Sequence, residues 1–186
     1  MPHPNFELRA ALVAFADRHP QRTAEVVLFQ RFLESDPAVF GREHREGHFT
    51  GSAWIVDASG QRCLLTLHAK LGRWLQLGGH ADGDPDLAAV ALREAEEESG
   101  LAGLEVDPRI FDIDRHRIPA RGSEPEHWHY DVRFVVHARA DTRFVVSAES
   151  KALAWREVAQ LVADPSLDPS LRRMARLWSA GPSGSG

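Results

Sequence analysis

Hydrophobic side chains in the first forty residues recur at helical intervals. This spacing predicts one helix that ends at His19-Pro20 and a second helix over 22–34, which Asp36-Pro37 terminates. Nothing in these two helices indicates chemistry. Their role is open between a lid and a packing element, and they can equally form a dimer face.

Short apolar runs bounded by turn residues begin near Phe49 and predict strands. Candidate strands over 52–56 and 62–68 are joined by Asp57-Ala58-Ser59-Gly60, a turn that indicates a hairpin. Further strands are expected over 74–77, 109–117, 130–138 and 151–155, and closing helices over 156–162 and 170–178. This order of strands, central helix, strands and terminal helix predicts a mixed sheet sandwiched by helices.

The central helix has sequence signals at both ends. Asp84 is a good N-cap and Pro85 suits the first helical position, so we expect the helix to begin there. Gly100 suits the end, where a left-handed conformation is often needed.

The central helix also separates apolar from acidic positions. At about 100° per residue, the apolar stripe comprises Leu87, Ala88, Ala91, Leu92 and Ala95. Glu94, Glu97 and Glu98 fall together on an adjoining face, whereas Glu96 points away. Carboxylates at these spacings repel one another, so the arrangement favours cations between them, and hard oxygen ligands suit Mg²⁺ or Mn²⁺. On their own, the three glutamates fit a solvated acidic face equally well.

Composition narrows the classes of partner. The chain has 186 residues, enough for one domain, and a formal charge of −5, which argues against a nucleic-acid polymer as the partner. No apolar run approaches membrane-spanning length, and residues 1–5 lack the pattern of a signal peptide. The single cysteine, Cys63, lies in an apolar run and is interpreted as a core residue. We therefore expect a cytoplasmic protein without membrane contact.

A histidine-rich stretch allows three interpretations. His127, His129 and Asp131 alternate, so a strand would present all three on one face. They could form a transition-metal site, line a substrate pocket or lie at a partly exposed edge. Pocket lining is favoured for His129 and Asp131, because two imidazoles at this spacing are weak evidence for a metal.

Other side chains near the glycine pair Gly78-Gly79 are candidates for contact with a substrate. His80 follows the pair and is suited to contact phosphate, and His68 and Lys70 leave the strand that precedes it. Aromatic candidates for stacking on a base are Trp74, Trp128 and Tyr130. Aromatic residues at such positions are more often part of the core.

The run from Gly79 to Leu101 resembles the Nudix box. That motif is a glycine, five residues, a glutamate, seven residues, then Arg-Glu-apolar-any-Glu-Glu-any-Gly-apolar. Gly79 matches the first glycine, and the segment 93–101 matches the whole second half in register. The early glutamate is replaced by Pro85; Asp84 and Asp86 flank it out of register. The strand before the box and the region from Glu149 to Trp155 after it are also similar to the family.

The resemblance implies the overall organisation and the activity. It implies an α/β fold, a Nudix-like α/β/α sandwich with a mixed β-sheet, here with an N-terminal helical extension over 1–40, the Nudix domain over 41–180 and a flexible tail over 181–186. It implies a MutT-like pyrophosphohydrolase that uses Mg²⁺ or Mn²⁺. Water would attack phosphorus in a nucleoside diphosphate linked to another group, a small nucleotide-like molecule. A homodimer is left open.

The resemblance also implies roles for individual residues. Glu97 and Glu98 are the expected metal ligands, together with the carbonyl of Gly79. Glu94 is either a third ligand or the base that takes a proton from water. Arg93 is expected to orient a glutamate, with a surface salt bridge as the alternative.

Glu149, outside the box, is a candidate fourth carboxylate with a catalytic or ligand role. An exposed loop glutamate is an equally good interpretation of this residue.

Two other functions on the same fold remain as alternatives. A nucleotide sensor that does not hydrolyse its ligand would typically lack the paired glutamates, which are present here, and Pro85 is the one feature in its favour. An isomerase resembling the isopentenyl diphosphate isomerases would need a cysteine in the pocket, and Cys63 lies in an apolar run instead.

Overall fold

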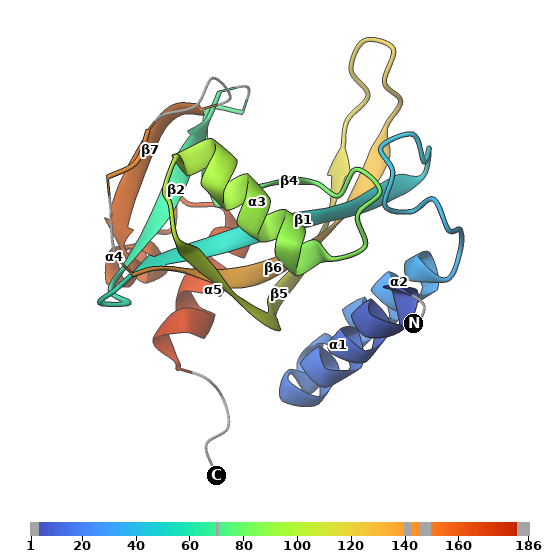
Figure 1. The fold of residues 1–186 in the computed structure, drawn as a ribbon, viewed down its shortest axis with the longest axis horizontal. Coiled ribbons are helices and arrows are strands. Elements are labelled where there is room, and N and C mark those ends of the chain that lie inside the picture. The colour runs from blue at the N-terminus through green and yellow to red at the C-terminus, as the bar shows by residue number, and fades with distance from the viewer. Residues whose placement is uncertain (1–3, 70, 140–142, 146–149, 182–186) are drawn as a thin grey trace.

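A mixed seven-stranded β-sheet forms the centre of the computed structural model, which describes residues 4–69, 71–139, 143–145 and 150–181. Helix α3 covers one face of the sheet, helices α4 and α5 lie behind it, and α1 and α2 lie side by side at one end (Figure 1). The expected α/β/α sandwich with an N-terminal helical element is therefore confirmed. Among the described residues, no helix is long and apolar enough to cross a membrane.

The helices and strands follow the predicted order closely. The helices are α1 (Pro4–Arg18), α2 (Thr23–Leu33), α3 (Leu87–Ser99), α4 (Val158–Ala163) and α5 (Pro169–Ser179), with a 3-10 turn, η1, at Pro20–Arg22. The strands are β1 (Gly47–Asp57), β2 (Arg62–His68), β3 (Trp74–Leu75), β4 (Leu77–His80), β5 (Leu104–Ile118), β6 (His127–Ala138) and β7 (Ser150–Glu157).

Strand β1 is the centre of the sheet. The strand order is β3-β2-β1-β6-β5, with β4 paired to β1 and β7 paired to β2. The β1–β6 pair is parallel, whereas β1 pairs in antiparallel fashion with β2 and β4. The hairpin predicted around 57–60 is confirmed by the β1–β2 pairing. Residues from β1, β4 and β6 consequently lie side by side.

Two predicted boundaries before α3 are wrong. The run expected as one strand over 74–77 divides into β3, which pairs with β2, and β4, which pairs with β1. Glycine permits this crossing, because a side chain at Gly78 would overlap Ser52 of β1. Helix α3 begins at Leu87 rather than Pro85, and its N-cap is Asp86.

The N-cap is Asp86 rather than Asp84 because the two carboxylates accept hydrogen bonds from different backbone amides. The Asp86 side chain accepts a hydrogen bond from the Ala89 N–H (3.0 Å), as an N-cap should. Asp84 instead accepts from the N–H of Asp86 (3.0 Å) and stabilises the turn before the helix. The predicted end is confirmed, since Gly100 has a φ of 67°.

Apolar side chains pack on both faces of the sheet. The α3 face continues into the N-terminal helices, where Phe32 stacks on Tyr130 of β6 with ring centroids 3.9 Å apart. These helices are thus a packing element. On α3 the buried apolar residues are Leu87, Val90, Ala91 and Ala95, so Val90 replaces the predicted Ala88 and Leu92, which are only partly buried.

The opposite face packs against α4 and α5. Its cluster includes Trp54, Leu65 and Met174, and it contains Cys63. Burial raises the pKa of the Cys63 thiol, which confirms that Cys63 is a core residue and removes the basis for the isomerase alternative.

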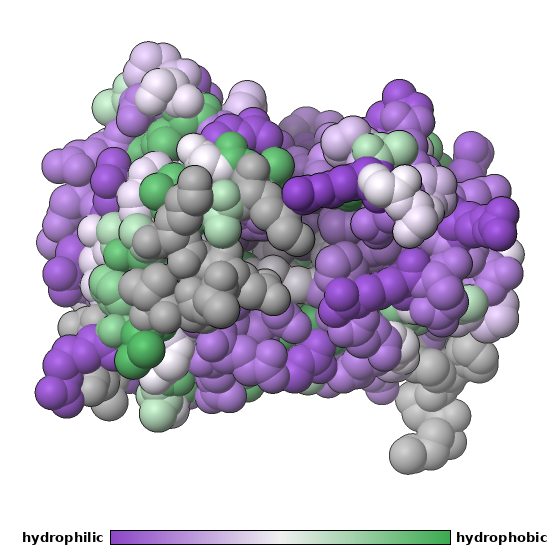
Figure 2. Space-filling view, turned by 90° about the horizontal axis from the view of Figure 1, so that it is seen from above, coloured by the Kyte–Doolittle hydropathy of each residue, from purple (hydrophilic) through white to green (hydrophobic). Residues whose placement is uncertain are grey.

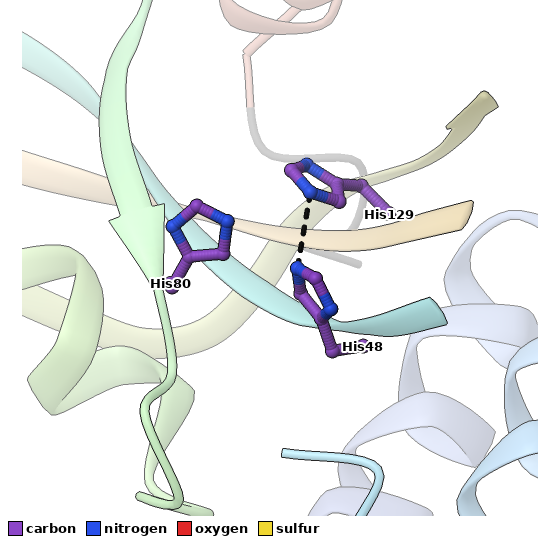
Figure 3. Close-up of side chains that lie close together, drawn as sticks. All are labelled: His48, His80 and His129. Atoms are coloured by element: carbon purple, nitrogen blue, oxygen red, sulfur yellow. Dashed lines mark hydrogen bonds between the residues drawn. The ribbon is translucent and has the colours of Figure 1, made fainter. Parts of the chain in front are cut away.

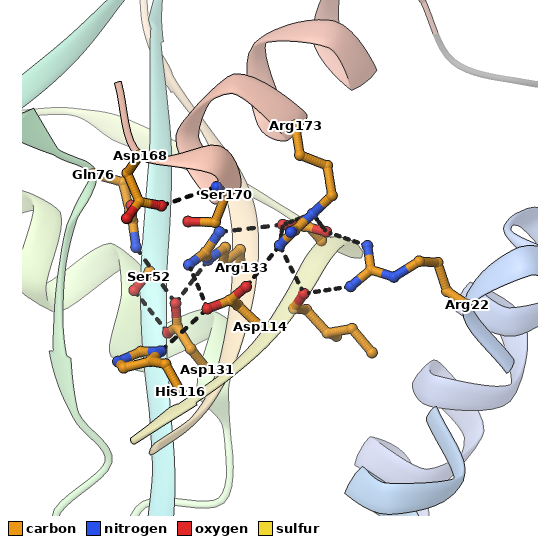
Figure 4. A network of polar contacts seen from close by, with 12 residues as sticks. Arg22, Ser52, Gln76, Asp114, His116, Asp131, Arg133, Asp168, Ser170 and Arg173 are labelled. Atoms are coloured by element: carbon orange, nitrogen blue, oxygen red, sulfur yellow. Dashed lines mark hydrogen bonds and ion pairs between the residues drawn. The ribbon is translucent and has the colours of Figure 1, made fainter. Parts of the chain in front are cut away.

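A buried charge network joins the sheet to helices from both halves of the chain (Figure 4). Arg133 is 2% exposed and donates to Asp131 (2.7 Å) and Asp112 (3.2 Å). Asp112 is fully buried and also accepts from Arg22 (2.9 Å) and from Arg173 of α5 (2.8 Å). One carboxylate therefore contacts three guanidinium groups, and Asp114 and Asp131 supply further negative charge to the network.

We expect the Asp112→Asn substitution to lower the free energy of unfolding by about 3–5 kcal/mol, because it removes a fully buried counter-charge that three guanidinium groups share. Urea denaturation followed by circular dichroism measures this change. The matched control is Asp107→Asn, whose partner Arg109 has a 69% exposed side chain, and it should cost less than about 1 kcal/mol. Equal losses in the two variants would show that the network does not stabilise the fold.

Candidate functional site

Two glutamates of α3 lie against the backbone of β4. Any side chain at Gly79 would overlap the Glu94 carboxylate. Glu98 accepts a hydrogen bond from the Gly78 N–H through Oε1 (2.9 Å). The glycine pair thus allows carboxylate oxygens of the helix to approach the strand directly.

Helix α3 brings its glutamates to the glycine pair because it packs closely on β1. A methyl group at Gly51 would lie 2.7 Å from the Leu87 carbonyl oxygen and 3.0 Å from the Val90 side chain. Because such contacts are too short, only glycine lets the helix lie this near the sheet.

The four glutamates of the motif differ in exposure. Glu94 and Glu98 are partly buried against β4, and Glu97 is exposed one residue before Glu98. Glu96 is also exposed, which agrees with its predicted position away from the group. Carboxylates of α3 thus lie beside the glycine backbone of β4, where they are partly buried or exposed to solvent.

Arg93 links α3 to the end of β4, at the residue that follows the glycine pair. Its Nη2 donates to the carbonyl oxygen of His80 (3.2 Å) and to Oε1 of Glu94 (3.4 Å). Its Nη1 lies 3.8 Å from Asp84. Arg93 therefore makes the contact with a glutamate that the expected orienting role requires.

Pro85, which replaces the early glutamate of the motif, lies in the turn before α3. The two flanking carboxylates, at Asp84 and Asp86, have structural partners there: Asp86 caps the helix and Asp84 faces Arg93. Both carboxylates are engaged in organising the helix start.

Four histidines from three strands gather on the neighbouring part of the sheet. His127 and His129 lie on β6 as predicted, His48 is the register partner of His129 on β1, and His80 comes from β4. His48, His80 and His129 present ring nitrogens that all lie within 4.8 Å of one another (Figure 3). Sequence analysis missed His48; the signal was the polar alternation of His48, Thr50 and Ser52 in an otherwise apolar strand.

Burial keeps these imidazoles neutral. It lowers the pKa of His48 to about 4, with further lowering by His80 and His127. Burial likewise lowers the pKa of His129, where the neighbouring imidazoles add to the effect, and the pKa of His80. At pH 7 each of the three rings therefore carries one N–H and one lone pair.

Asp131 shares a face with these histidines, but its carboxylate is surrounded by protein donors. It is 2% exposed and accepts hydrogen bonds from Thr50 (2.9 Å), Ser52 (2.8 Å) and Arg133 (2.7 Å). The side chain therefore holds β1 and β6 in register, and the metal grouping considered from the sequence, with His127 and Asp131, is replaced by His48, His80 and His129.

The remaining predicted contact residues lie apart from this group. Trp74 packs against the α4 and α5 cluster, with the Arg156 guanidinium 5.4 Å from its ring centroid. Tyr130 belongs to the core, and the guanidinium carbon of Arg115 lies 3.6 Å from the ring centroid of Trp128.

Two residues named from the sequence, Lys70 and Glu149, lie outside the described residues.

Solved structures of other proteins share this fold. The Ap4A hydrolase of C. elegans superposes with a TM-score of 0.56 at 18% identity, over 71% of this chain and 95% of that one. The dihydroneopterin triphosphate pyrophosphohydrolase of E. coli gives 0.55 at 16% identity, over 69% and 92%. The MutT protein of Methanosarcina mazei Go1 gives 0.53 at 17% identity, over 73% and 95%. Likeness at these identities establishes the fold.

Membership of a family is shown by the sequence. No curated protein sequence matches the chain. A family profile described as the NUDIX domain matches residues 48–178, a span that begins at His48 and includes the glutamate helix and most of α5. The chain belongs to the Nudix family.

Proposed function

We propose that this protein hydrolyses the diphosphate linkage of a nucleoside diphosphate derivative, with a divalent metal ion held by the glutamates of α3. The observation that carries the proposal is the approach of Glu94 and Glu98 to the backbone of Gly78 and Gly79, in the register of the Nudix box. The proposal gives these side chains a common task.

The donor set fits Mg²⁺ or Mn²⁺. Glu97 and Glu98 are proposed as direct ligands, with the Gly79 carbonyl and Glu94 as further oxygen donors. Hard carboxylate and carbonyl oxygens are the ligands these ions prefer. The space that a side chain at Gly79 would fill is occupied by the Glu94 carboxylate, which therefore lies directly against the β4 backbone.

The protein groups would divide the work of the reaction. The bound ion would neutralise phosphate oxygens and lower the pKa of a coordinated water. Glu94 is proposed as a ligand or as the base that accepts the proton of the attacking water. Arg93 would keep Glu94 and the β4 backbone in a fixed relation, through its hydrogen bonds to both.

The proposed substrate is a small nucleotide-like diphosphate. His80 and His129 would line the pocket beside the glycine pair, and Asp131 would act by positioning β1 and β6. Lys70 is proposed as a further substrate contact and Glu149 as a further carboxylate, whereas Trp74 packs on the opposite face of the sheet and is not proposed as a contact.

We expect Glu97→Gln and Glu98→Gln each to lower kcat by about 1,000-fold, or ~4 kcal/mol, because each loses a charged ligand of the ion. The assay is Mg²⁺-dependent release of phosphate or nucleotide from a panel of nucleoside diphosphate derivatives. The matched control is Glu96→Gln on the exposed side of the same helix, which should retain full activity.

Full activity in the Glu97 and Glu98 variants would refute the assignment of the ligands. A wild-type protein that binds a nucleotide tightly but turns over no panel member would instead support the sensor alternative.

We expect Gly79→Ala to lower kcat by about 100-fold, since the added methyl must displace the Glu94 carboxylate and shifts of about 1 Å have effects of this size. The same assay measures it. Gly103→Ala serves as the control: its φ of +68° makes alanine strained there, but the added methyl meets no neighbouring group within 4 Å, so kcat should be retained. Unchanged kcat in a folded Gly79→Ala protein would mean that the contact with Glu94 has no catalytic importance.

A further inference from the structure

We propose that His48, His80 and His129 form a second metal site, which binds a transition-metal ion of the zinc type and is distinct from the glutamate site of α3. The three rings come from β1, β4 and β6 and converge on one point (Figure 3). The glutamates of α3 are not among its ligands, so metal binding at this site can be measured separately from hydrolysis.

Distances between the ring nitrogens agree with coordination. A tetrahedral ion with metal–nitrogen bonds of about 2.0–2.1 Å separates its ligands by roughly 3.3 Å. Nε2 of His48 and Nε2 of His129 are 3.1 Å apart, and the His80 nitrogen lies within the same 4.8 Å group. Small side-chain rotations would bring all three to bonding distance.

Counting protons shows why hydrogen bonds alone do not satisfy the cluster. His127 Nδ1 lies 2.9 Å from the Pro125 carbonyl oxygen, which can only accept, so the proton is on Nδ1 and Nε2 carries a lone pair. That Nε2 is 3.3 Å from His129 Nε2, which also faces His48 Nε2. With at most one proton on His129 Nε2, one of the two contacts lacks a good hydrogen bond. For a neutral His127 ring, a cation bound by His48 and His129 removes the conflict between these two rings.

A buried polar atom without a partner points the same way. His48 is 1% exposed, and its Nδ1 has no hydrogen-bond partner. An unsatisfied buried group of this kind costs about 1–3 kcal/mol, and structures retain such groups where function requires them. The unpaired nitrogen is not the one that faces His129, so an ion on Nε2 would leave it unsatisfied, and the cost of burying the ring is consistent with a functional role for His48.

A cleft lies beside the cluster, and an ion bound there would have a free position. A cleft of about 430 Å³ is lined by His127, together with Arg42 and Arg45, and His127 contacts His129. Three protein ligands leave a fourth position for water or an anionic oxygen. Imidazole nitrogen favours zinc-like ions over Mg²⁺, so the two sites would select different metals.

The test is Zn²⁺ titration by calorimetry of the full chain, stripped with a chelator and kept in excess Mg²⁺. We expect one Zn²⁺ per chain, with affinity lowered at least about tenfold in His80→Asn and His129→Asn. His137→Asn, a partly exposed histidine on the same strand, and Glu98→Gln should bind Zn²⁺ like the wild type.

Wild-type protein loaded with Co²⁺ gives a measurement that does not depend on whether a variant folds. An intense visible absorption band, typical of four-coordinate Co²⁺, is expected, and a weak six-coordinate spectrum would overturn the proposal. So would an absence of Zn²⁺ binding, equal loss in His137→Asn, or loss in Glu98→Gln, which would assign the ion to the carboxylates.

Discussion

The structure depends on neutralising one guanidinium group inside the sheet. Arg133 points away from water, and an uncompensated charge there would cost several kcal/mol. The aspartates that balance it come from β5 and from β6 itself, and Asp112 in turn binds Arg22 and Arg173. Arg22 of η1 and Arg173 of α5 thus contribute charge to the interior of the sheet, which makes the elements flanking the sheet part of its electrostatics.

The same network extends to the candidate site. Asp131 binds Arg133 on one side and Thr50 and Ser52 on the other, so it holds β6 beside β1. The resulting register brings His48 opposite His129. The buried charges thus determine the geometry of the histidine cluster without contacting its metal-binding nitrogens.

The glutamate site on α3 could be predicted from local sequence patterns. The histidine cluster could not, because it depends on pairing between strands that are far apart in the sequence. The positions of Glu94 and Glu98 on one helix face follow from helical periodicity, which is contained in a short segment. His48 is 81 residues from His129 in the hydrogen bond that joins them, and no local rule identifies that pairing. The choice between Asp84 and Asp86 as N-cap depends on the exact course of the turn, which hydrophobic spacing does not specify.

The glycines of β1 and β4 also limit how this protein can change. A side chain at Gly51 would meet the main chain of α3 and one at Gly79 would meet the Glu94 carboxylate, so a point mutation at either glycine moves the helix or the carboxylate. Divergence in substrate choice must therefore arise at the rim of the site, in loops and strand ends whose side chains can vary. A lineage of such proteins would keep its reaction centre constant while its recognition surface drifts.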